Sequence, residues 1–323
     1  MLREIDRVAA NPAASAADPA FLADVLAGFA SAQKAVPARW FYDHRGSELF
    51  EAITALPEYY PTRTERRILA AAAGEIAARV GPRRAVVEFG SGSSAKTPLL
   101  LSAVAPSAYV PVDISGAFLR ESAAALARSF PHLPIHPLEA DFLKPLALPA
   151  ALAGAPRLGF FPGSTIGNME ADAAVDLLRT LAATLGAGAQ LVIGIDRIKG
   201  EDVLLPAYDD AQGVTAQFNL NVLVRINREL GANIPVRAFR HRVRWNDAAA
   251  RIEMHLEAQR DLAFTIAGRP FSIRAGETIH TENSHKYGPR DASLLLRAAG
   301  WTPVAGWTDP EELFAVLLAE VAP

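Results

Sequence analysis

The sequence predicts an α/β protein with a mostly parallel sheet, plus a second α+β domain formed from the N-terminal segment and an insertion. Between residues 85 and 196, short apolar runs alternate with helical patterns. That alternation is typical of βαβ units and of a parallel sheet buried on both faces. After residue 197 the pattern changes to segments of alternating polarity, which indicate antiparallel strands with one solvated face.

The elements of the parallel region can be placed in order. The strands are expected at Ala85–Phe89, Ala108–Val112, Pro134–Leu138, Leu158–Pro162 and Gln190–Ile195. The helices are expected at Glu65–Val80, Pro98–Ala105, Gly116–Ser129, Ala171–Leu185 and Asp291–Ala299. Prolines 57 and 61 mark a boundary before the first of these helices, so Thr62 or Thr64 is expected to cap it. A final apolar run, Leu313–Leu318, returns to the α/β pattern.

The remaining segments predict the second domain. A helix is expected at Phe218–Leu230, and antiparallel strands at Ala238–Trp245, Arg251–Arg260, Leu262–Ile266 and Phe271–Ile273. The N-terminal part contributes helical spacing over residues 1–36 and an amphipathic stretch, Ser47–Leu56. We therefore expect one domain at 63–197 and 288–323, and a second at 1–62 and 198–287.

Composition narrows the classes of function. The chain has 323 residues, half of them apolar, with a net charge of −3 and no cysteine. Disulfides, thiolate zinc sites, iron–sulfur clusters and a cysteine nucleophile are excluded, and the charge makes nucleic acid an unexpected main partner. No window approaches 18 apolar residues, and no apolar signal-peptide core is present. A cytoplasmic protein without a membrane span or a metal site is expected.

A glycine turn follows the first predicted strand. The segment Glu88-Phe-Gly90-Ser91-Gly92-Ser-Ser-Ala-Lys96-Thr lets the backbone approach a ligand beside a helix N-terminus. A phosphate-binding P-loop nearly matches, but Ala95 replaces its second glycine. Ala95 also stands at the third glycine of a dinucleotide fingerprint, where alanine is allowed, so it argues only weakly against that pattern. The turn could also be a structural feature that binds no ligand.

S-adenosylmethionine (SAM) is the third ligand that this turn could hold. Glu88 supplies an acid in the first strand, and Asp113 supplies another at the end of the second strand. A carboxylate there can accept hydrogen bonds from both ribose hydroxyls. Asp141 and Phe142 after the third strand suit the adenine, with a carboxylate for the exocyclic amine and a ring for stacking. This set is typical of a SAM site, and a nicotinamide dinucleotide stays open on these residues alone.

An ordered set of motifs resembles the SAM-dependent L-histidine Nα-methyltransferases of ergothioneine biosynthesis. Each motif is short, but they follow one another from about residue 40 to the C-terminus. Besides the glycine turn they are Leu56-Pro-Glu-Tyr-Tyr-Pro-Thr-Arg63, Tyr109-Val-Pro-Val-Asp-Ile-Ser, Phe161-Pro-Gly-Ser-Thr-Ile-Gly-Asn168, Ala207-Tyr-Asp-Asp, Phe218-Asn-x-Asn221, Asn227-Arg-Glu-Leu and Thr281-Glu-Asn-Ser-His-Lys-Tyr287. The resemblance implies a Rossmann-like class I methyltransferase fold and three successive methyl transfers to the α-amine of histidine, giving hercynine.

The resemblance also implies roles for individual residues. The cofactor S-adenosyl-L-methionine is expected to contact Glu88, Gly90, Ser91, Gly92, Lys96, Asp113, Asp141 and Phe142. The α-amino and carboxylate groups of L-histidine are expected to meet Tyr59, Asn168 and Tyr208, which would align the amine for catalysis. The imidazole is expected to face Tyr42, Glu282 and Ser284. Asn283 stands where some members of the family carry an apolar residue.

Other functions remain open at this stage. The chain could methylate another aromatic amino acid or amine, although an indole would leave Glu282 and Ser284 buried without partners. A nicotinamide-dependent oxidoreductase would use the glycine turn for a pyrophosphate. A non-catalytic module would bind SAM without turnover. No protein partner is indicated.

Overall fold

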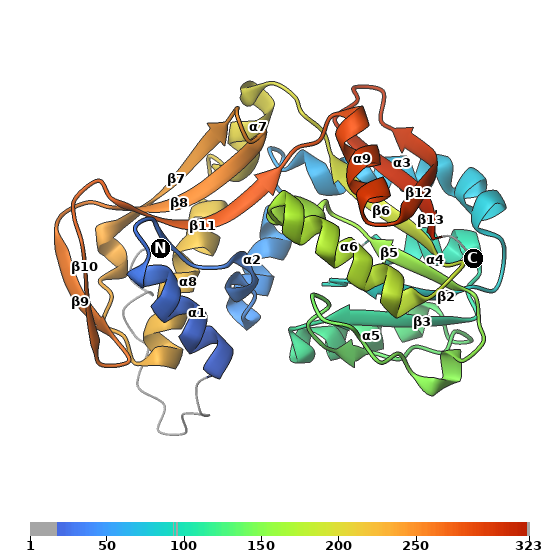
Figure 1. Ribbon diagram of the computed structural model, residues 1–323, viewed down its shortest axis with the longest axis horizontal. Coiled ribbons are helices and arrows are strands. Elements are labelled where there is room, and N and C mark those ends of the chain that lie inside the picture. Colours follow the sequence, from blue (N-terminus) through green and yellow to red (C-terminus); the bar gives the residue numbers. More distant parts are fainter. Residues whose placement is uncertain (1–17, 93, 95, 322–323) are drawn as a thin grey trace. The chain divides into compact units, whose positions relative to one another are not determined.

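The computed structural model describes residues 18–92, 94 and 96–321, and the chain divides into two compact units (Figure 1). Unit 1 comprises 1–53, 208–244 and 253–282, and unit 2 comprises 54–207, 245–252 and 283–323. The N-terminal and insertion segments thus share a unit. The boundaries lie after residues 53, 207 and 282, whereas the sequence placed them after 62, 197 and 287, and the segment 245–252 belongs to unit 2. Residues 1–17 lie outside the described part of the chain.

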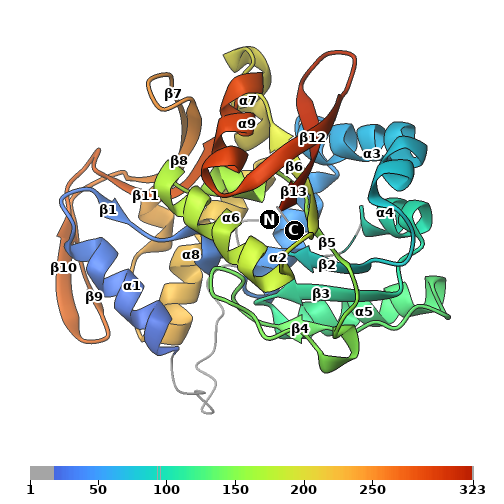
Figure 2. The ribbon, with the colours of Figure 1, turned by 45° about the vertical axis from the view of Figure 1, so that its right-hand side comes forward.

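Unit 2 is built around a seven-stranded sheet of order β12-β13-β6-β5-β2-β3-β4. The strands β2 to β6 pair in parallel, whereas β13 runs antiparallel to both β6 and β12 (Figure 2). Their bounds are β2 Ala85–Phe89, β3 Ala108–Asp113, β4 Leu138–Glu139, β5 Arg157–Phe161, β6 Gln190–Asp196, β12 Trp301–Thr308 and β13 Phe314–Val321. The mostly parallel sheet confirms the predicted fold class.

Helices cover both faces of this sheet. The bounds of these helices are α3 Tyr60–Val80, α4 Thr97–Val104, α5 Gly116–Ser129, α6 Ala171–Leu185 and α9 Pro289–Ala298, and a further helix, α7, spans Glu201–Tyr208. Apolar residues of α3, α4 and α5 pack with Val86 of β2 on one face. Those of α6 and α9 pack with Val87 and Phe89 on the other. Because successive strand residues point to opposite faces, both faces of β2 are buried, which explains its unbroken apolar sequence.

Unit 1 combines helices with a β9–β10 hairpin and most of a mixed four-stranded sheet of order β1-β11-β8-β7. One end each of β7, β8 and β11 is assigned to unit 2. The bounds are α1 Pro19–Ala30, α2 His44–Thr54, α8 Val214–Leu230, β1 Lys34–Ala35, β7 Phe239–Asn246, β8 Arg251–Ala258, β9 Leu262–Ile266, β10 Arg269–Ile273 and β11 Thr278–His285. Phe29 of α1 contacts Phe264 and Phe271 of the hairpin edge-on, with ring centroids 5.8 and 5.7 Å away. The apolar face of α1 therefore packs against the hairpin.

Several elements begin and end at the predicted residues, among them β2, β9, α5 and α6. The predicted cap of α3 is wrong, because Thr62 and Thr64 lie within the helix and Pro61 occupies its first turn. Proline is tolerated there because the first N–H groups of a helix have no intrahelical partner. No helix among the described residues is long and apolar enough to cross a membrane.

Two edge strands of the large sheet differ from the prediction. The strand expected at Pro134–Leu138 is reduced to an isolated bridge at Ile135 and the short β4. The sequence prediction also missed β12, in which Trp301 is buried and the following residues alternate in exposure. Edge strands carry a weaker apolar signal because only part of their surface is covered.

Candidate active site

The glycine turn after β2 takes a conformation that only glycine adopts easily. Gly90 and Gly92 have φ angles of +74° and +48°. The N–H groups of Gly90 and Ser91 both donate to the carbonyl of Val112, at 2.9 and 3.1 Å, which fixes the turn against the end of β3. A Cβ atom on Gly90 would lie 3.5 Å from the ring of Phe142. The turn and Phe142 are therefore close neighbours at the carboxyl edge of the sheet.

Asp113 is held in a fixed orientation beside this turn. Its Oδ2 accepts from the N–H of Gly92 at 3.0 Å, and its Oδ1 accepts from the N–H of Ser115 at 2.9 Å. Asp141 likewise accepts from the N–H of Leu143 at 3.0 Å through Oδ1. Each carboxylate oxygen has more than one acceptor position. Both side chains are half-buried, so they combine a fixed position with access from solvent.

The hydroxyl of Ser91 supports a ligand at the turn. Ser91 is 5% exposed, and its Oγ atom is buried with no hydrogen-bond partner among the described residues. A buried hydroxyl without a partner costs free energy, and a polar ligand could remove that cost. Together with the two neighbouring carboxylates, which accept hydrogen bonds, this hydroxyl fits the hydroxyl and amino groups of a nucleoside such as that of SAM.

Glu88 lies beneath the turn and braces it. Its side chain is buried, and Oε2 accepts from the hydroxyls of Thr97 and Tyr109 at 2.7 and 2.6 Å. Burial raises the pKa of Glu88 to about 7, against the opposing effect of these two hydrogen bonds. The carboxyl group thus ties the start of α4 to β3, and its observed contacts assign it a positioning role.

Lys96 is held by a glutamate that the sequence did not single out. Its Nζ lies 2.5 Å from Oε2 of Glu65, a fully buried residue of α3. The same Oε2 accepts from the N–H of Gly163 at 2.9 Å, in the turn after β5. Glu65 thereby joins three segments that converge on the carboxyl edge of the sheet. Within an ordinary helical pattern, nothing marked it as a site residue.

A second missed cluster surrounds Asp196 at the end of β6. Its carboxylate accepts from the hydroxyl of Tyr60, at 2.8 and 2.9 Å, and from Lys199 and Lys286, at 2.6 and 2.7 Å. Burial alone would raise the pKa of Asp196, but the two ammonium groups hold it below its usual value. Burial also lowers the pKa of Lys199 to about 8. The cluster is a compact, charged anchor inside unit 2.

This cluster organises the three predicted substrate residues of unit 2. Lys286 donates to the hydroxyl of Ser284 at 2.8 Å, and Tyr60 directly follows Tyr59 at the start of α3. The N–H of Asp196 donates to Ser164, in the turn that leads to Asn168, at 2.9 Å. That turn, which ends in the 3₁₀ segment Thr165–Asn168, also meets β11, where Nδ1 of His285 lies 2.9 Å from the carbonyl of Gly167. Segments bearing Tyr59, Asn168 and Ser284 are therefore joined through one network.

The other three predicted substrate residues belong to unit 1. The ring of Tyr42 packs edge-on against Phe50 and Phe218, with centroids 5.7 and 5.8 Å away. Tyr208 is 8% exposed, and its carbonyl lies 2.9 Å from Nε2 of His241. The half-buried Glu282 lies on β11, its carbonyl 3.1 Å from Nε2 of His280.

Asn283 lies on the other face of β11 from the predicted imidazole contacts. Its amide donates to Glu170 at 3.0 Å within unit 2. Alternation along β11 points it to the face opposite Glu282 and Ser284. The variation at this position therefore does not alter the face of β11 that carries the predicted imidazole contacts.

Comparison with known proteins decides the family. A family model described as histidine-specific, SAM-dependent methyltransferase matches residues 21–321. The chain belongs to this family. A histidine N-alpha-methyltransferase of Mycolicibacterium smegmatis is 41% identical over 313 residues, which cover 95% of this chain and 97% of that protein. Ergothioneine biosynthesis protein 1 of Neurospora crassa is 29% identical over 88% of this chain, which matches 33% of that longer protein.

Among solved structures, the CcbJ methyltransferase from Streptomyces caelestis is similar in fold. It is 17% identical, with a TM-score of 0.49, and the match covers 87% of this chain and all of that one.

Proposed function

We propose that this methyltransferase moves methyl groups from SAM to the α-amine of L-histidine, three times in succession, giving hercynine for ergothioneine biosynthesis. The observation that carries the proposal is the 41% identity to a histidine N-alpha-methyltransferase over nearly the whole of both chains. The match includes the segments of both units, so it extends beyond the SAM-binding edge of the sheet. Membership of a histidine-specific, SAM-dependent family supports the same cofactor and substrate.

The residues of the glycine turn are proposed to hold SAM. Asp113 would accept hydrogen bonds from the ribose hydroxyls, and Asp141 and Phe142 would meet the adenine. Ser91 would gain the partner that its buried hydroxyl lacks among the described residues. When bound, SAM supplies a methyl group on a positively charged sulfur, and the protein's task is to align an acceptor with it.

Alignment of the α-amine is assigned to Tyr59, Asn168 and Tyr208. Their hydroxyl and amide groups can bind an amino acid's charged groups without placing a fixed positive charge beside a cationic product. The amine attacks only as the neutral base, so it must lose a proton before each transfer, and each transfer releases S-adenosylhomocysteine and leaves the positive charge on the methylated amine. Correct alignment of the reacting atoms can contribute roughly 7–11 kcal/mol to lowering the barrier. Aromatic side chains also favour a quaternary ammonium product by about 0.5–2 kcal/mol.

Recognition of the imidazole is assigned to Tyr42, Glu282 and Ser284. A neutral imidazole has one N–H donor and one acceptor nitrogen. Glu282 can accept from the donor. Ser284 already accepts a hydrogen bond from Lys286, which directs the serine proton away from that ammonium and suits donation to the acceptor nitrogen. The Asp196 cluster would thus help to set which way Ser284 presents its hydroxyl.

The decisive test is mass spectrometry of L-histidine incubated with SAM and the purified protein. We expect products heavier by one, two and three methylene units, with the trimethylated species accumulating. Tryptophan incubated in parallel should remain largely unmodified. Protein that is stabilised by SAM but leaves histidine unmodified would be a binding module instead. Thermal stabilisation by NAD and not by SAM would contradict the assigned cofactor.

A further inference from the structure

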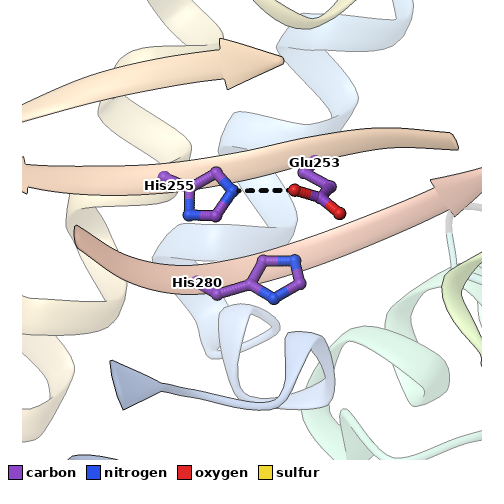
Figure 3. A group of neighbouring side chains, drawn as sticks. All are labelled: Glu253, His255 and His280. Carbon is purple, nitrogen blue, oxygen red and sulfur yellow. Dashed lines mark hydrogen bonds and ion pairs between the residues drawn. The ribbon is translucent and has the colours of Figure 1, made fainter. Parts of the chain in front are cut away.

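Two histidines and a glutamate lie together on the sheet of unit 1 (Figure 3). Glu253 and His255 are two residues apart on β8, so their side chains point to the same face. His280 comes from the neighbouring strand β11, and its ring stacks on that of His255 with centroids 4.7 Å apart. One nitrogen from each ring and one carboxylate oxygen all lie within 4.8 Å of one another. The fold brings together histidines that are 25 positions apart in the sequence.

Two of the three side chains are largely buried, so an ion between them would be shielded from solvent. The side chain of His255 is 5% exposed, and that of Glu253 is 14% exposed. Nδ1 of His255 is buried with no hydrogen-bond partner among the described residues, so the polar needs of this ring are only partly met. A neutral imidazole is the form that coordinates a metal ion.

We propose that Glu253, His255 and His280 form a binding site for a divalent ion of the zinc class, separate from the methyl-transfer chemistry. Two imidazole nitrogens and one carboxylate oxygen suit Zn²⁺ and its neighbours among the transition metals, whereas Ca²⁺ and Mg²⁺ prefer oxygen ligands throughout. Three protein ligands leave room for a water molecule in the fourth position of a tetrahedral site. No metal site was expected from the sequence, because these histidines follow no metal-binding spacing.

Only small movements of the three ligand atoms are needed to hold a zinc ion. Zinc binds nitrogen and oxygen at about 2.0–2.2 Å, so ligand atoms of a tetrahedral site lie about 3.3 Å apart. Nε2 of His255 and Oε2 of Glu253 are already 3.2 Å apart. The nitrogen of His280 must therefore move closer to the other two ligand atoms by about 1.5 Å at most. Rotation of the His280 side chain can supply this movement. The ion would link β8 to β11.

The site does not depend on the ion for its own stability. Nε2 of His255 has Glu253 as a partner, and Nε2 of His280 has the carbonyl of Glu282, 3.1 Å away. The fold is therefore complete in hydrogen bonding at these nitrogens, and the ion would add a reversible link. Because His280 lies two residues before Glu282 on β11, that link would restrain the strand that carries a proposed imidazole contact.

The test is calorimetric titration of Zn²⁺ into purified, chelator-treated full-length protein. We expect saturable binding of one ion, at least tenfold weaker in His280→Ala and in Glu253→Gln. Glu253→Gln preserves size and a hydrogen bond to His255, so it separates ligation from packing. His44→Ala is the matched control, because His44 also pairs with a glutamate, Glu48 at 3.6 Å, but with its side chain 68% exposed. It should bind Zn²⁺ as the unaltered protein does.

Co²⁺ supplies a second measurement, because a site of low coordination number with imidazole ligands gives visible d–d absorption that a surface-adsorbed ion lacks. The unaltered protein should show this absorption, and His280→Ala should lose it while keeping its circular dichroism spectrum. No saturable Zn²⁺ binding by the unaltered protein would overturn the proposal. Equal binding by the unaltered protein and both site variants would overturn it as well. Neither result depends on SAM or on methyl transfer.

Discussion

At the scale of single residues, Glu88 links proton binding to folding. Burial raises its pKa to about 7 in the folded protein, from an ordinary value of 4.5. Between these two values the folded state holds the proton more tightly than the unfolded state does. The contribution of Glu88 to stability therefore falls as the pH rises from about 4.5 to about 7, and is constant outside that range.

The substitution Glu88→Gln should remove this dependence. Glutamine has the same shape and stays neutral, and its carbonyl oxygen can accept from Thr97 or Tyr109. We expect the variant to gain stability relative to the unaltered protein as the pH rises through this window. Urea unfolding of both proteins at a series of pH values measures the difference. A difference independent of pH would mean that the Glu88 carboxyl titrates alike in both states.

Asp113 offers a residue-scale test of cofactor binding. Asp113→Ala removes the proposed acceptor of the ribose hydroxyls, so the affinity for SAM should fall by about 1.5–3 kcal/mol, the scale of hydrogen bonds to a charged group. Asp113→Asn keeps one acceptor oxygen, so its affinity for SAM should lie between those of the unaltered protein and Asp113→Ala. Asp172→Ala, an exposed substitution in the first turn of α6, should have no effect. Calorimetric affinities for SAM that are equal in all four proteins would remove Asp113 from the ribose role.

At the scale of elements, Gly194 of β6 shows how closely the strands and α3 pack around the site. A Cβ atom at this position would lie 2.1 Å from Oε1 of Glu65 and 3.1 Å from the backbone nitrogen of Gly163. The buried carboxylate that holds Lys96 therefore occupies the space a side chain would need. Helix α3, strand β6 and the turn after β5 can pack this closely only while residue 194 has no side chain.

We expect Gly194→Ala to destabilise the protein and to weaken SAM binding, because displacing Glu65 releases Lys96 beside the glycine turn. Gly74→Ala is the control, an exposed position within α3 with no atom within 4 Å of the added Cβ. That change should stabilise the protein by roughly 0.5–1 kcal/mol, since alanine favours helix over glycine. Thermal unfolding and SAM titration of both variants check the pair. Unchanged SAM affinity in a folded Gly194→Ala protein would show that Lys96 does not need Glu65.

How far the sequence could predict the structure depended on whether the signal was local. Buried parallel strands such as β2 are continuous apolar runs, and the amphipathic helices α5 and α6 repeat every three to four residues, so both were found. The turn after β2 and Asp113 were found for the same reason, because each follows its own strand directly. The weak edge strands β4 and β12 were not.

Interactions between segments far apart in the sequence could not be predicted from local patterns. Lys96 and Glu65 are 31 residues apart, and Tyr60 and Asp196 are 136 apart. Each of these residues is unremarkable within its own element, because a glutamate or tyrosine near a helix start is common. Only the fold shows that they are buried and paired. The Glu253, His255 and His280 cluster was invisible for the same reason.

At the scale of the whole molecule, the proposed roles divide between the two units. All the residues assigned to SAM belong to unit 2, as do Tyr59, Asn168 and Ser284. Tyr42, Tyr208 and Glu282 belong to unit 1. Substitutions at these unit 1 residues should therefore change the kinetics with histidine while leaving the affinity for SAM unchanged, whereas those at the glycine turn should change both.

The division leads to a prediction about specificity. Glu282→Ala removes the acceptor proposed for the imidazole N–H, so about 1.5–3 kcal/mol of transition-state binding should be lost for histidine. Phenylalanine has no ring N–H to donate and should lose little or even gain. Sites built to hydrogen-bond a substrate can discriminate by roughly 10⁴–10⁵ against analogues that leave their polar groups unpaired. The ratio of kcat/KM for histidine over phenylalanine should therefore fall.

Asn168→Ala and Tyr208→Phe provide the contrast, because every amino acid presents the α-amino and carboxylate groups that they are proposed to bind. These variants should lower kcat/KM for all substrates alike and leave the ratio unchanged. Assays with a chelator present keep any ion at His280 from influencing the neighbouring Glu282. If Glu282→Ala also leaves the ratio unchanged, its carboxylate is a structural residue of β11. Histidine selection would then rest with Ser284 and Tyr42, which the same ratio measured in Ser284→Ala and Tyr42→Phe would show.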